Sequence, residues 1–291
     1  MERMLLSFGH GYSARALSRL LIPRGWRVVG TTRSTRKAAS LRADGVEPWI
    51  WPDNPVDSVL AKATHVLVSA GPTEDGDPVL AALRDELAEA ASQLAWVGYL
   101  STTGVYGDHG GGWVDEGTRL APSTRRGQLR VEAEAAWQAL AAQTGLPLHI
   151  FRLAGIYGPG RGPFEKVRNG TARRIIKHGQ VFSRIHVEDI ARVLAASIAR
   201  SNPGAIYNVC DDDPAPPQDV IAFAAELLDL PLPPAVDYET AGLSPMARSF
   251  YAESKRVRND RIKAELEVNL KYPTYKAGLR DLLKREGGGA V

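Results

Sequence analysis

The sequence has almost no cysteine, no long apolar stretch and little net charge. Cys210 is the only cysteine among 291 residues, so the chain cannot form an internal disulfide or a cysteine-based zinc cluster. No apolar run approaches the roughly 20 residues that a membrane-spanning helix needs. The formal net charge is +3, and basic residues do not alternate with aromatic ones as in a nucleic-acid-binding surface. We therefore expect neither a membrane protein nor a DNA- or RNA-binding protein.

The beginning of the chain and its composition favour a cytoplasmic globular protein. The segment MERMLLSFGHGYS lacks a charged leader followed by a long apolar stretch and a small-residue cleavage site. Apolar residues make up 44% and charged residues 24% of the sequence, which is typical of globular domains. No histidine and carboxylate spacing suggests a metal site, so we expect no metal.

Short apolar segments alternate with helical patterns along the chain. Strands are predicted at residues 4–8, 26–32, 45–51, 64–70, 96–102, 146–153 and 205–210. Helices are predicted at residues 78–95, 126–143, 187–200, 217–230 and 254–266, and one more follows the first strand. Nearly all-apolar strands alternating with helices predict an α/β fold with a doubly wound parallel sheet, whose ligands bind beyond the carboxyl ends of the strands.

A glycine-rich segment joins the first strand to the first helix. Gly9, Gly11 and Ala14 occupy the three positions of a dinucleotide fingerprint, in which alanine is an accepted third residue. Gly9 permits a tight turn, and Gly11 lets the backbone approach a pyrophosphate at the helix start, Tyr12 and Ser13. A bare turn of two glycines is the alternative, but the strand–turn–helix context favours dinucleotide binding.

The end of the second strand indicates which dinucleotide binds. An acidic residue there would hold the ribose 2′-hydroxyl of NAD, but the chain has Thr32, Arg33 and Ser34. An arginine fork beside hydroxyl groups suits a 2′-phosphate, so we predict NADP rather than NAD, with a solvated basic turn as the alternative. Ala70 and Gly71, after the fourth strand, are expected to lie near the adenosine side of the cofactor.

The composition changes after the sixth strand. Glycine, proline and arginine dominate residues 155–185. We interpret residues 1–154 as an NAD(P)-binding Rossmann domain. Residues 155–291 would then form a smaller C-terminal substrate lobe, interleaved with the first domain and closing over its ligand face.

Several segments together resemble a known superfamily. They are GHGYSA (9–14), STTGVYG (101–107), FRLAGIYGPG (151–160), SRIHVEDIA (183–191) and YNVCDD (207–212). In order and spacing they resemble the extended and atypical short-chain dehydrogenases/reductases, in particular the NAD(P)-dependent epimerase/dehydratase-like proteins. The resemblance covers most of residues 1–215. It implies the Rossmann fold and also makes a homodimer plausible.

The resemblance assigns roles to three residues near the fifth strand. In the family a serine or threonine polarises the substrate oxygen, and a Tyr-x-x-x-Lys pair moves the proton and holds the nicotinamide ribose. Thr102 matches the first role, whereas Arg126 and Arg130 stand where the tyrosine and lysine are expected. A guanidinium stays protonated in proteins, so Arg126 cannot replace the tyrosine as an acid–base group. Arg130 could still bind a ribose or phosphate.

Three interpretations of these arginines stay open. They could lie on a solvated helix face, or they could bind an anionic substrate or a cofactor phosphate. Proton transfer could also have moved to another residue, leaving a working reductase or epimerase. Tyr106 and Tyr157 are the candidates for such a displaced group, although each also suits a packing role.

Cations are concentrated in the segment expected to cover the ligand. Residues 158–186 contain seven lysines and arginines and one acid, Glu165. This excess predicts an anionic substrate bound by Arg161 and Arg184, together with Tyr157 and His186, with a solvated basic loop as the alternative. His186 could titrate near neutral pH, but it could instead anchor the start of a helix.

The predicted function follows from these sites. We expect an NAD(P)-binding oxidoreductase or epimerase/dehydratase-like protein that transfers hydride on a small anionic or nucleotide-linked substrate. The alternative is a non-catalytic NADP-binding sensor or regulatory protein.

Overall fold

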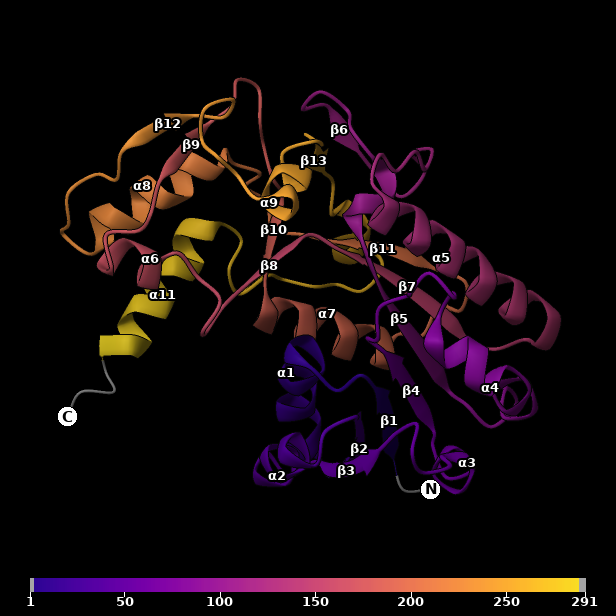
Figure 1. Ribbon diagram of the computed structural model, residues 1–291. Coiled ribbons are helices and arrows are strands. Elements are labelled where there is room, and N and C mark those ends of the chain that lie inside the picture. The colour runs from indigo at the N-terminus through magenta and orange to yellow at the C-terminus, as the bar shows by residue number, and fades with distance from the viewer. Residues whose placement is uncertain (1–2, 288–291) are drawn as a thin grey trace.

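The fold is built on one seven-stranded parallel sheet with helices on both faces (Figure 1). It is known from a computed structural model that describes residues 3–287. The strand order is β11-β7-β5-β4-β1-β2-β3, and each neighbouring pair is parallel. The strands are β1 (Met4–Phe8), β2 (Arg27–Thr32), β3 (Glu47–Ile50), β4 (His65–Val68), β5 (Trp96–Thr102), β7 (Leu148–Leu153) and β11 (Ile206–Val209). The predicted doubly wound parallel sheet is confirmed.

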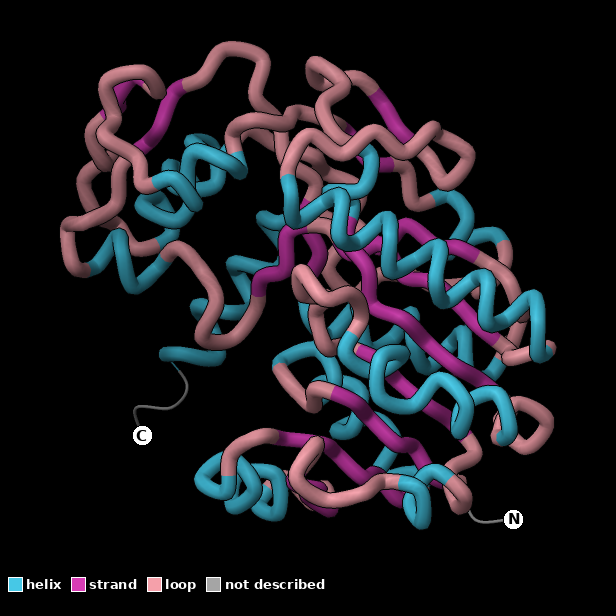
Figure 2. The backbone as a smooth tube through the Cα atoms, turned by 45° about the vertical axis from the view of Figure 1, so that its right-hand side comes forward, coloured by secondary structure: helices cyan, strands magenta, loops and turns pink. Residues whose placement is uncertain are grey.

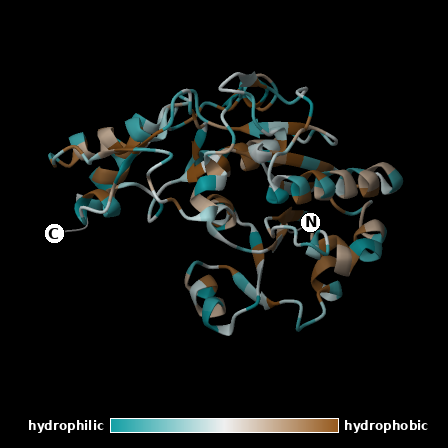
Figure 3. Cartoon of the chain, turned by 45° about the horizontal axis from the view of Figure 1, so that its top comes forward, coloured by the Kyte–Doolittle hydropathy of each residue, from teal (hydrophilic) through white to brown (hydrophobic). Residues whose placement is uncertain are grey.

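The two faces of the sheet have separate apolar cores. On β1, Leu5 belongs to one core and Leu6 to the other, because successive side chains point to opposite faces. The first core includes residues of α1 (Tyr12–Leu21), α2 (Thr35–Ala43) and α7 (Val187–Ala199). The second includes residues of α3 (Asp57–Leu60), α4 (Pro78–Glu89) and α5 (Arg125–Thr144). Helices on both faces explain why most residues of these strands are apolar. Figure 3 colours each residue of the chain by its hydropathy.

The smaller lobe lies beside the main sheet (Figure 2) and has a third apolar core of its own. This core is formed by residues of α6 (Phe164–Arg168), α8 (Pro217–Leu227) and α11 (Tyr275–Gly287). Three short parallel pairs accompany it: β8 (Gly155–Tyr157) with β10 (Arg184–His186), β9 (Arg174–Ile176) with β12 (Ala235–Asp237), and β6 (Trp113–Val114) with β13 (Arg256–Val257). Three further helical pieces are η2 (Thr103–Tyr106), α9 (Pro245–Phe250) and α10 (Asp260–Ala264).

The second half of the chain returns to the main sheet. β11 pairs with β7, and α7 covers the same face as α1, so the two halves are interleaved around one sheet. The helix predicted at 254–266 is wrong, because its first part forms β13 against β6 and only α10 is helical. Among residues 3–287, no helix combines the length and apolarity required to cross a membrane.

Candidate functional site

The turn after β1 packs against the segment after β4, so predicted cofactor-binding residues that follow these two strands lie together. Gly9 has a φ of 71°, and a Cβ there would lie 2.9 Å from the backbone nitrogen of Ala70. The backbone N–H of Gly9 donates to the Thr31 hydroxyl at 2.9 Å, and the Ser69 hydroxyl donates to the Gly9 carbonyl at 2.5 Å. Any larger residue would separate the ends of β1 and β4, so glycine is required at this position.

The start of α1 is open to an anion. Gly11 precedes the helix, is exposed, and offers no side chain to cap the first N–H groups. No acidic residue lies in the first turn, and Ala14 is fully buried where the helix meets the sheet. Uncapped N–H groups at the positive end of a helix are suited to binding a pyrophosphate. Gly11, Tyr12 and Ser13 therefore have the backbone arrangement expected for cofactor binding.

The turn after β2 contains the residue that caps α2, Ser34, and an exposed arginine, Arg33. The Ser34 hydroxyl accepts from the Lys37 N–H at 3.4 Å, and Thr32 Oγ1 accepts from the Ser34 N–H at 3.2 Å. Arg33 is exposed and makes no hydrogen bond or ion pair with another residue between 3 and 287. The two hydroxyls shape the turn, while the Arg33 guanidinium is free to meet a charged ligand.

Thr102 lies at the carboxyl end of β5, on the same edge as the glycine turn. Its Oγ1 accepts from the Gly104 N–H at 3.2 Å, and the residue is half-buried. The start of α5 packs against this loop, since a Cβ on Gly127 would lie only 2.9 Å from the Gly104 carbonyl oxygen. This contact sets the beginning of α5 beside the end of β5.

The arginines at the start of α5 differ in their surroundings. Arg125 pairs with Glu74 at 2.5 Å, whereas Arg126 is exposed and has no such partner in the described part of the chain. Arg130 turns inward: its Nη1 donates to the Tyr99 hydroxyl at 2.9 Å and to the Leu100 carbonyl at 2.8 Å. Its Nη2 lies 3.4 Å from where a Cβ of Gly71 would stand. The structure thus brings Arg130, but not Arg126, into a defined position between the ends of β4 and β5.

Tyr106 faces the interior rather than an open site. Its hydroxyl donates to Asn208 Oδ1 at 2.7 Å and accepts from Arg152 Nη1 at 3.0 Å. Burial raises the pKa of Tyr106 to about 12, although the neighbouring Arg152 opposes the shift. Of the two roles that the sequence left open for this tyrosine, the structure favours packing.

The four residues predicted on the substrate side lie around the β8–β10 pair. Arg161 is 5.1 Å from the Tyr12 ring, and the Tyr12 hydroxyl donates to the Pro159 carbonyl, so this loop lies over the start of α1. Arg161, Arg184 and Tyr157 all line a cavity of about 350 Å³. Burial raises the pKa of Tyr157, whose hydroxyl has no hydrogen-bond partner among the described residues.

His186 lies beside this cavity and begins α7. Its Nδ1 accepts from the Glu188 N–H at 3.2 Å, and its ring is 4.1 Å from the Tyr272 ring. Burial lowers the pKa of His186 to about 4. The imidazole is therefore neutral near pH 7, and the geometry favours the helix-anchoring role over acid–base chemistry.

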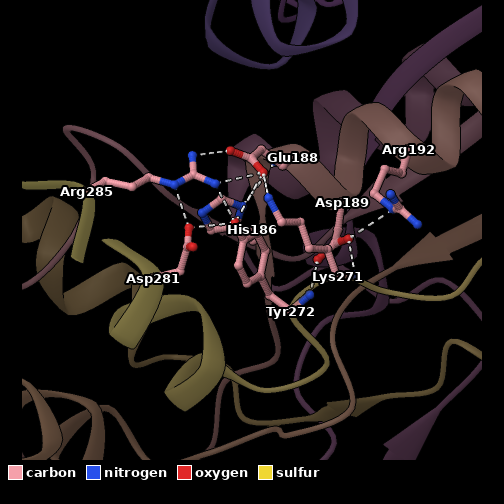
Figure 4. Close-up of polar contacts among 8 residues, drawn as sticks. All are labelled: His186, Glu188, Asp189, Arg192, Lys271, Tyr272, Asp281 and Arg285. Atoms are coloured by element: carbon pink, nitrogen blue, oxygen red, sulfur yellow. Dashed lines mark hydrogen bonds and ion pairs between the residues drawn. The ribbon is translucent and has the colours of Figure 1, made fainter. Parts of the chain in front are cut away.

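A charged network ties the start of α7 to the C-terminal helix (Figure 4). The Glu188 carboxylate accepts from Lys271 Nζ at 2.9 Å and pairs with Arg285. Burial opposes its ionisation, but the hydrogen bonds from Arg285 and Lys271 prevail and lower the pKa of Glu188 to about 2. Asp189 accepts from the N–H groups of Lys271 and Tyr272 at 2.7 and 2.9 Å. The network positions α11, which forms one wall of the cavity.

Sequence reasoning did not predict the ion pair buried behind the site. Arg152 is 3% exposed and Glu134 is 1% exposed, and they pair at 2.7 Å beneath the end of β5. An arginine inside the apolar segment LPLHIFRL was the signal, because a buried cation needs a partner. Tyr275, also in the cavity wall, lies in a part of the sequence with no motif. Among residues 3–287, no group of histidine, cysteine or carboxylate side chains is arranged to hold a metal ion.

With this geometry established, comparison with known proteins identifies the family. Residues 8–210 match the NAD dependent epimerase/dehydratase family, which is more than half of the chain. The chain belongs to this family. The matched range begins at Phe8, the last residue of β1, and ends at Cys210, directly after β11, so it contains the glycine turn and the other six strands of the main sheet.

Three known proteins resemble this chain at different levels of sequence identity. A structure of a functionally unknown conserved protein from Silicibacter pomeroyi is 63% identical, with a TM-score of 0.93 over 97% of this chain and 99% of that one. Protein YeeZ of Escherichia coli K12 is 29% identical over 69% of this chain and 75% of its own length. UDP-glucuronic acid 4-epimerase from Bacillus cereus, solved with NAD, is 17% identical with a TM-score of 0.76 over 97% of this chain and 99% of its own. The last likeness shows the shared epimerase/dehydratase fold.

Proposed function

We propose that this epimerase/dehydratase-family protein binds NADP along the carboxyl edge of its sheet. The observation that supports this proposal most directly is the tight turn at Gly9. The turn packs on Ala70 and leads into α1, whose first N–H groups have no side-chain cap. Gly11, Tyr12 and Ser13 would hold the pyrophosphate through the backbone. Arg33 would hold the 2′-phosphate, for which a guanidinium is suited in charge and shape. Family membership supports a nicotinamide dinucleotide, and the choice of NADP rests on Arg33.

The second part of the proposal is oxidoreductase or epimerase/dehydratase-like chemistry on a small anionic or nucleotide-linked substrate. A bound nicotinamide would supply or accept a hydride. Thr102 would hydrogen-bond the substrate oxygen, since its hydroxyl lies at the end of β5 on the cofactor edge. Arg130, fixed by Tyr99 and Leu100, would bind a ribose or phosphate oxygen in place of the family's lysine.

The alternative is a non-catalytic NADP-binding sensor or regulatory protein. Arg126 in the tyrosine position favours it, because a guanidinium does not exchange protons near neutral pH. Tyr106 favours it too, because its hydroxyl is already hydrogen-bonded to Asn208 and Arg152 in the interior. In both proposals the protein acts in the cytoplasm, and a homodimer is its expected assembly.

Turnover separates the two proposals. NADPH consumption is measured with a panel of small carbonyl compounds that carry an anionic group, for the native chain and for Thr102→Val. Because an epimerase or dehydratase returns its hydride and consumes no net NADPH, isomerised or dehydrated products of anionic and nucleotide-linked hydroxy compounds are measured by NMR in parallel as turnover. If Thr102 polarises the substrate oxygen, the substitution lowers kcat/KM by roughly 100-fold. Thr103→Val is the matched control, since the Thr103 hydroxyl has no hydrogen bond among the described residues. Turnover unchanged by Thr102→Val would contradict the placement of the site, and tight NADPH binding without turnover would favour the sensor.

A further inference from the structure

The cavity in the smaller lobe, between β8, β10, α8 and α11, has a mainly apolar wall with two cations. Its volume is about 350 Å³, at the small end of ligand-binding pockets. Most of its wall is apolar or aromatic: Ile156, Pro163, Val220, Tyr275 and Leu279. Among residues 3–287, Arg161 and Arg184 are the only charged ones that line it. Such a wall suits an apolar molecule with one charged end.

The two guanidinium groups have no carboxylate partner within ion-pair distance in the described residues. Arg184 is anchored, because its Nη1 donates to the carbonyls of Phe182 and Ala215 at 2.8 and 2.9 Å, which leaves its other edge free. Its burial lowers the pKa of the guanidinium, so the cation is poorly solvated. The nearby Asp211 does not neutralise it near pH 7, since burial raises the pKa of that carboxyl to about 8. A partly buried cation without a partner favours an external anion.

A third polar group in the wall lacks a partner. Tyr157 is 8% exposed, and its hydroxyl makes no hydrogen bond with any residue from 3 to 287. The hydroxyl lies over α11, where a Cβ on Gly278 would come within 2.2 Å of it. Gly278 thus leaves space for the tyrosine tip. Because an unpaired buried hydroxyl is costly, it is expected to donate to a bound acceptor.

We propose that this cavity binds the carboxylate of a small, mainly apolar monoanion, with Arg161, Arg184 and Tyr157 as its donors. The proposal refines the substrate class of the proposed function and rests on that function only in treating the cavity as the substrate side. The free edge of Arg184 matches a planar carboxylate. A dianionic phosphate is disfavoured, because the Asp213 carboxylate already contributes negative charge around Arg184.

The test is calorimetric titration of the full chain with phenylacetate, phenylacetamide and phenyl phosphate, without nicotinamide cofactor. Phenylacetate should bind saturably, and its uncharged amide should bind much more weakly. Arg161→Gln should weaken phenylacetate binding by roughly tenfold or more, as expected for a lost charge-assisted hydrogen bond. Arg161 is exposed, so this variant keeps the fold. Tyr157→Phe, which retains the ring, should also weaken binding. Arg168→Gln is the control, because Arg168 lies in the same lobe and pairs with Glu286 outside the cavity.

Four results would overturn the proposal: no saturable phenylacetate binding, equal binding of the amide, tighter binding of phenyl phosphate, or an Arg168→Gln effect equal to that of Arg161→Gln. NADPH is titrated into the same preparations. Intact NADPH binding with no phenylacetate binding refutes the cavity proposal alone. Phenylacetate binding without NADPH binding refutes the cofactor proposal alone.

Discussion

At the scale of single residues, the most constrained side chains lie behind the site. Arg152 donates to both oxygens of Glu134 and to the Tyr106 hydroxyl, and Ser101 donates to Glu134 at 2.5 Å. Through these bonds one buried ion pair joins β5, α5 and β7 directly beneath Thr102. The network therefore fixes Ser101, the residue before Thr102, from the buried side of the strand.

Removing one charge of this pair should be costly. In Glu134→Gln, Arg152 stays buried with its charge uncompensated, so the free energy of unfolding should fall by about 3–5 kcal/mol. Glu132→Gln on the same helix is the control, because Glu132 is exposed and its 3.4 Å pair with Arg125 is worth at most about 1 kcal/mol. Urea denaturation measures both. Equal losses in the two variants would contradict the role given to the buried pair.

Gly9 allows a second test at the residue scale. Gly9 and Gly25 both have positive φ, 71° and 79°, but only at Gly9 would a Cβ meet a neighbouring strand. Gly25→Ala should therefore cost about 1 kcal/mol of conformational strain and leave NADPH binding intact. Gly9→Ala should cost more and also weaken NADPH binding, because Ala70 must move. The test is titration of both variants with NADPH. Equal NADPH affinities of Gly9→Ala and Gly25→Ala would contradict the role of the Gly9 turn in cofactor binding.

At the scale of elements, the main sheet was predictable and the lobe was not. All seven sheet strands were predicted, because burial on both faces makes such strands continuously apolar. The short strands β9, β12 and β13 carry no such pattern, since they pair over only two or three residues. The glycine turn could be found from spacing. The cavity could not, because Tyr157, Arg184 and Tyr275 come from distant segments that only tertiary packing brings together.

The C-terminal helix depends on the Glu188 network. Glu188→Gln removes the charge that binds Arg285 and Lys271, so amide hydrogen exchange in Tyr275–Gly287 should accelerate while β1 to β5 stay protected. Glu165→Gln on α6 is the control, since Glu165 is exposed and forms no ion pair among residues 3–287. Because the folded pKa of Glu188 is lowered to about 2, its contribution is fully present above its unfolded pKa and is lost progressively as the pH falls from there through about 2. Unchanged exchange in α11 would show that apolar packing alone holds it.

At the scale of the whole molecule, buried histidines set the response to acid. Burial lowers the pKa of His10, His65, His149 and His186 to about 4. Unfolded histidine titrates near 6.5, so the unfolded chain binds more protons between these values. Stability is full above about pH 6.5 and is lost as the pH falls toward 4, by up to about 1.4 kcal/mol per pH unit for each histidine. Asp211 acts in the opposite direction. Its folded pKa of about 8 means that the folded chain binds one more proton there than the unfolded chain, which offsets about one of the four histidines.

Urea denaturation at pH 7, 6 and 5 should therefore show a steadily falling free energy of unfolding. His65→Gln should reduce the slope by about one proton, because it removes one of the four groups. A free energy that is flat or rises toward pH 5 would contradict the neutral, buried state of these histidines.

The central claim is that the carboxyl edge of the sheet holds NADP and that Arg33 selects it. The most direct measurement is calorimetric titration with NADPH and NADH of the native chain, Arg33→Ala and Arg24→Ala. Arg24 is an exposed arginine just before β2, at the opposite edge of the sheet, and serves as the control. The account predicts that NADPH binds more tightly than NADH, that Arg33→Ala closes the gap, and that Arg24→Ala leaves it unchanged. Binding of neither nucleotide, or a preference that Arg33→Ala does not alter, would contradict it.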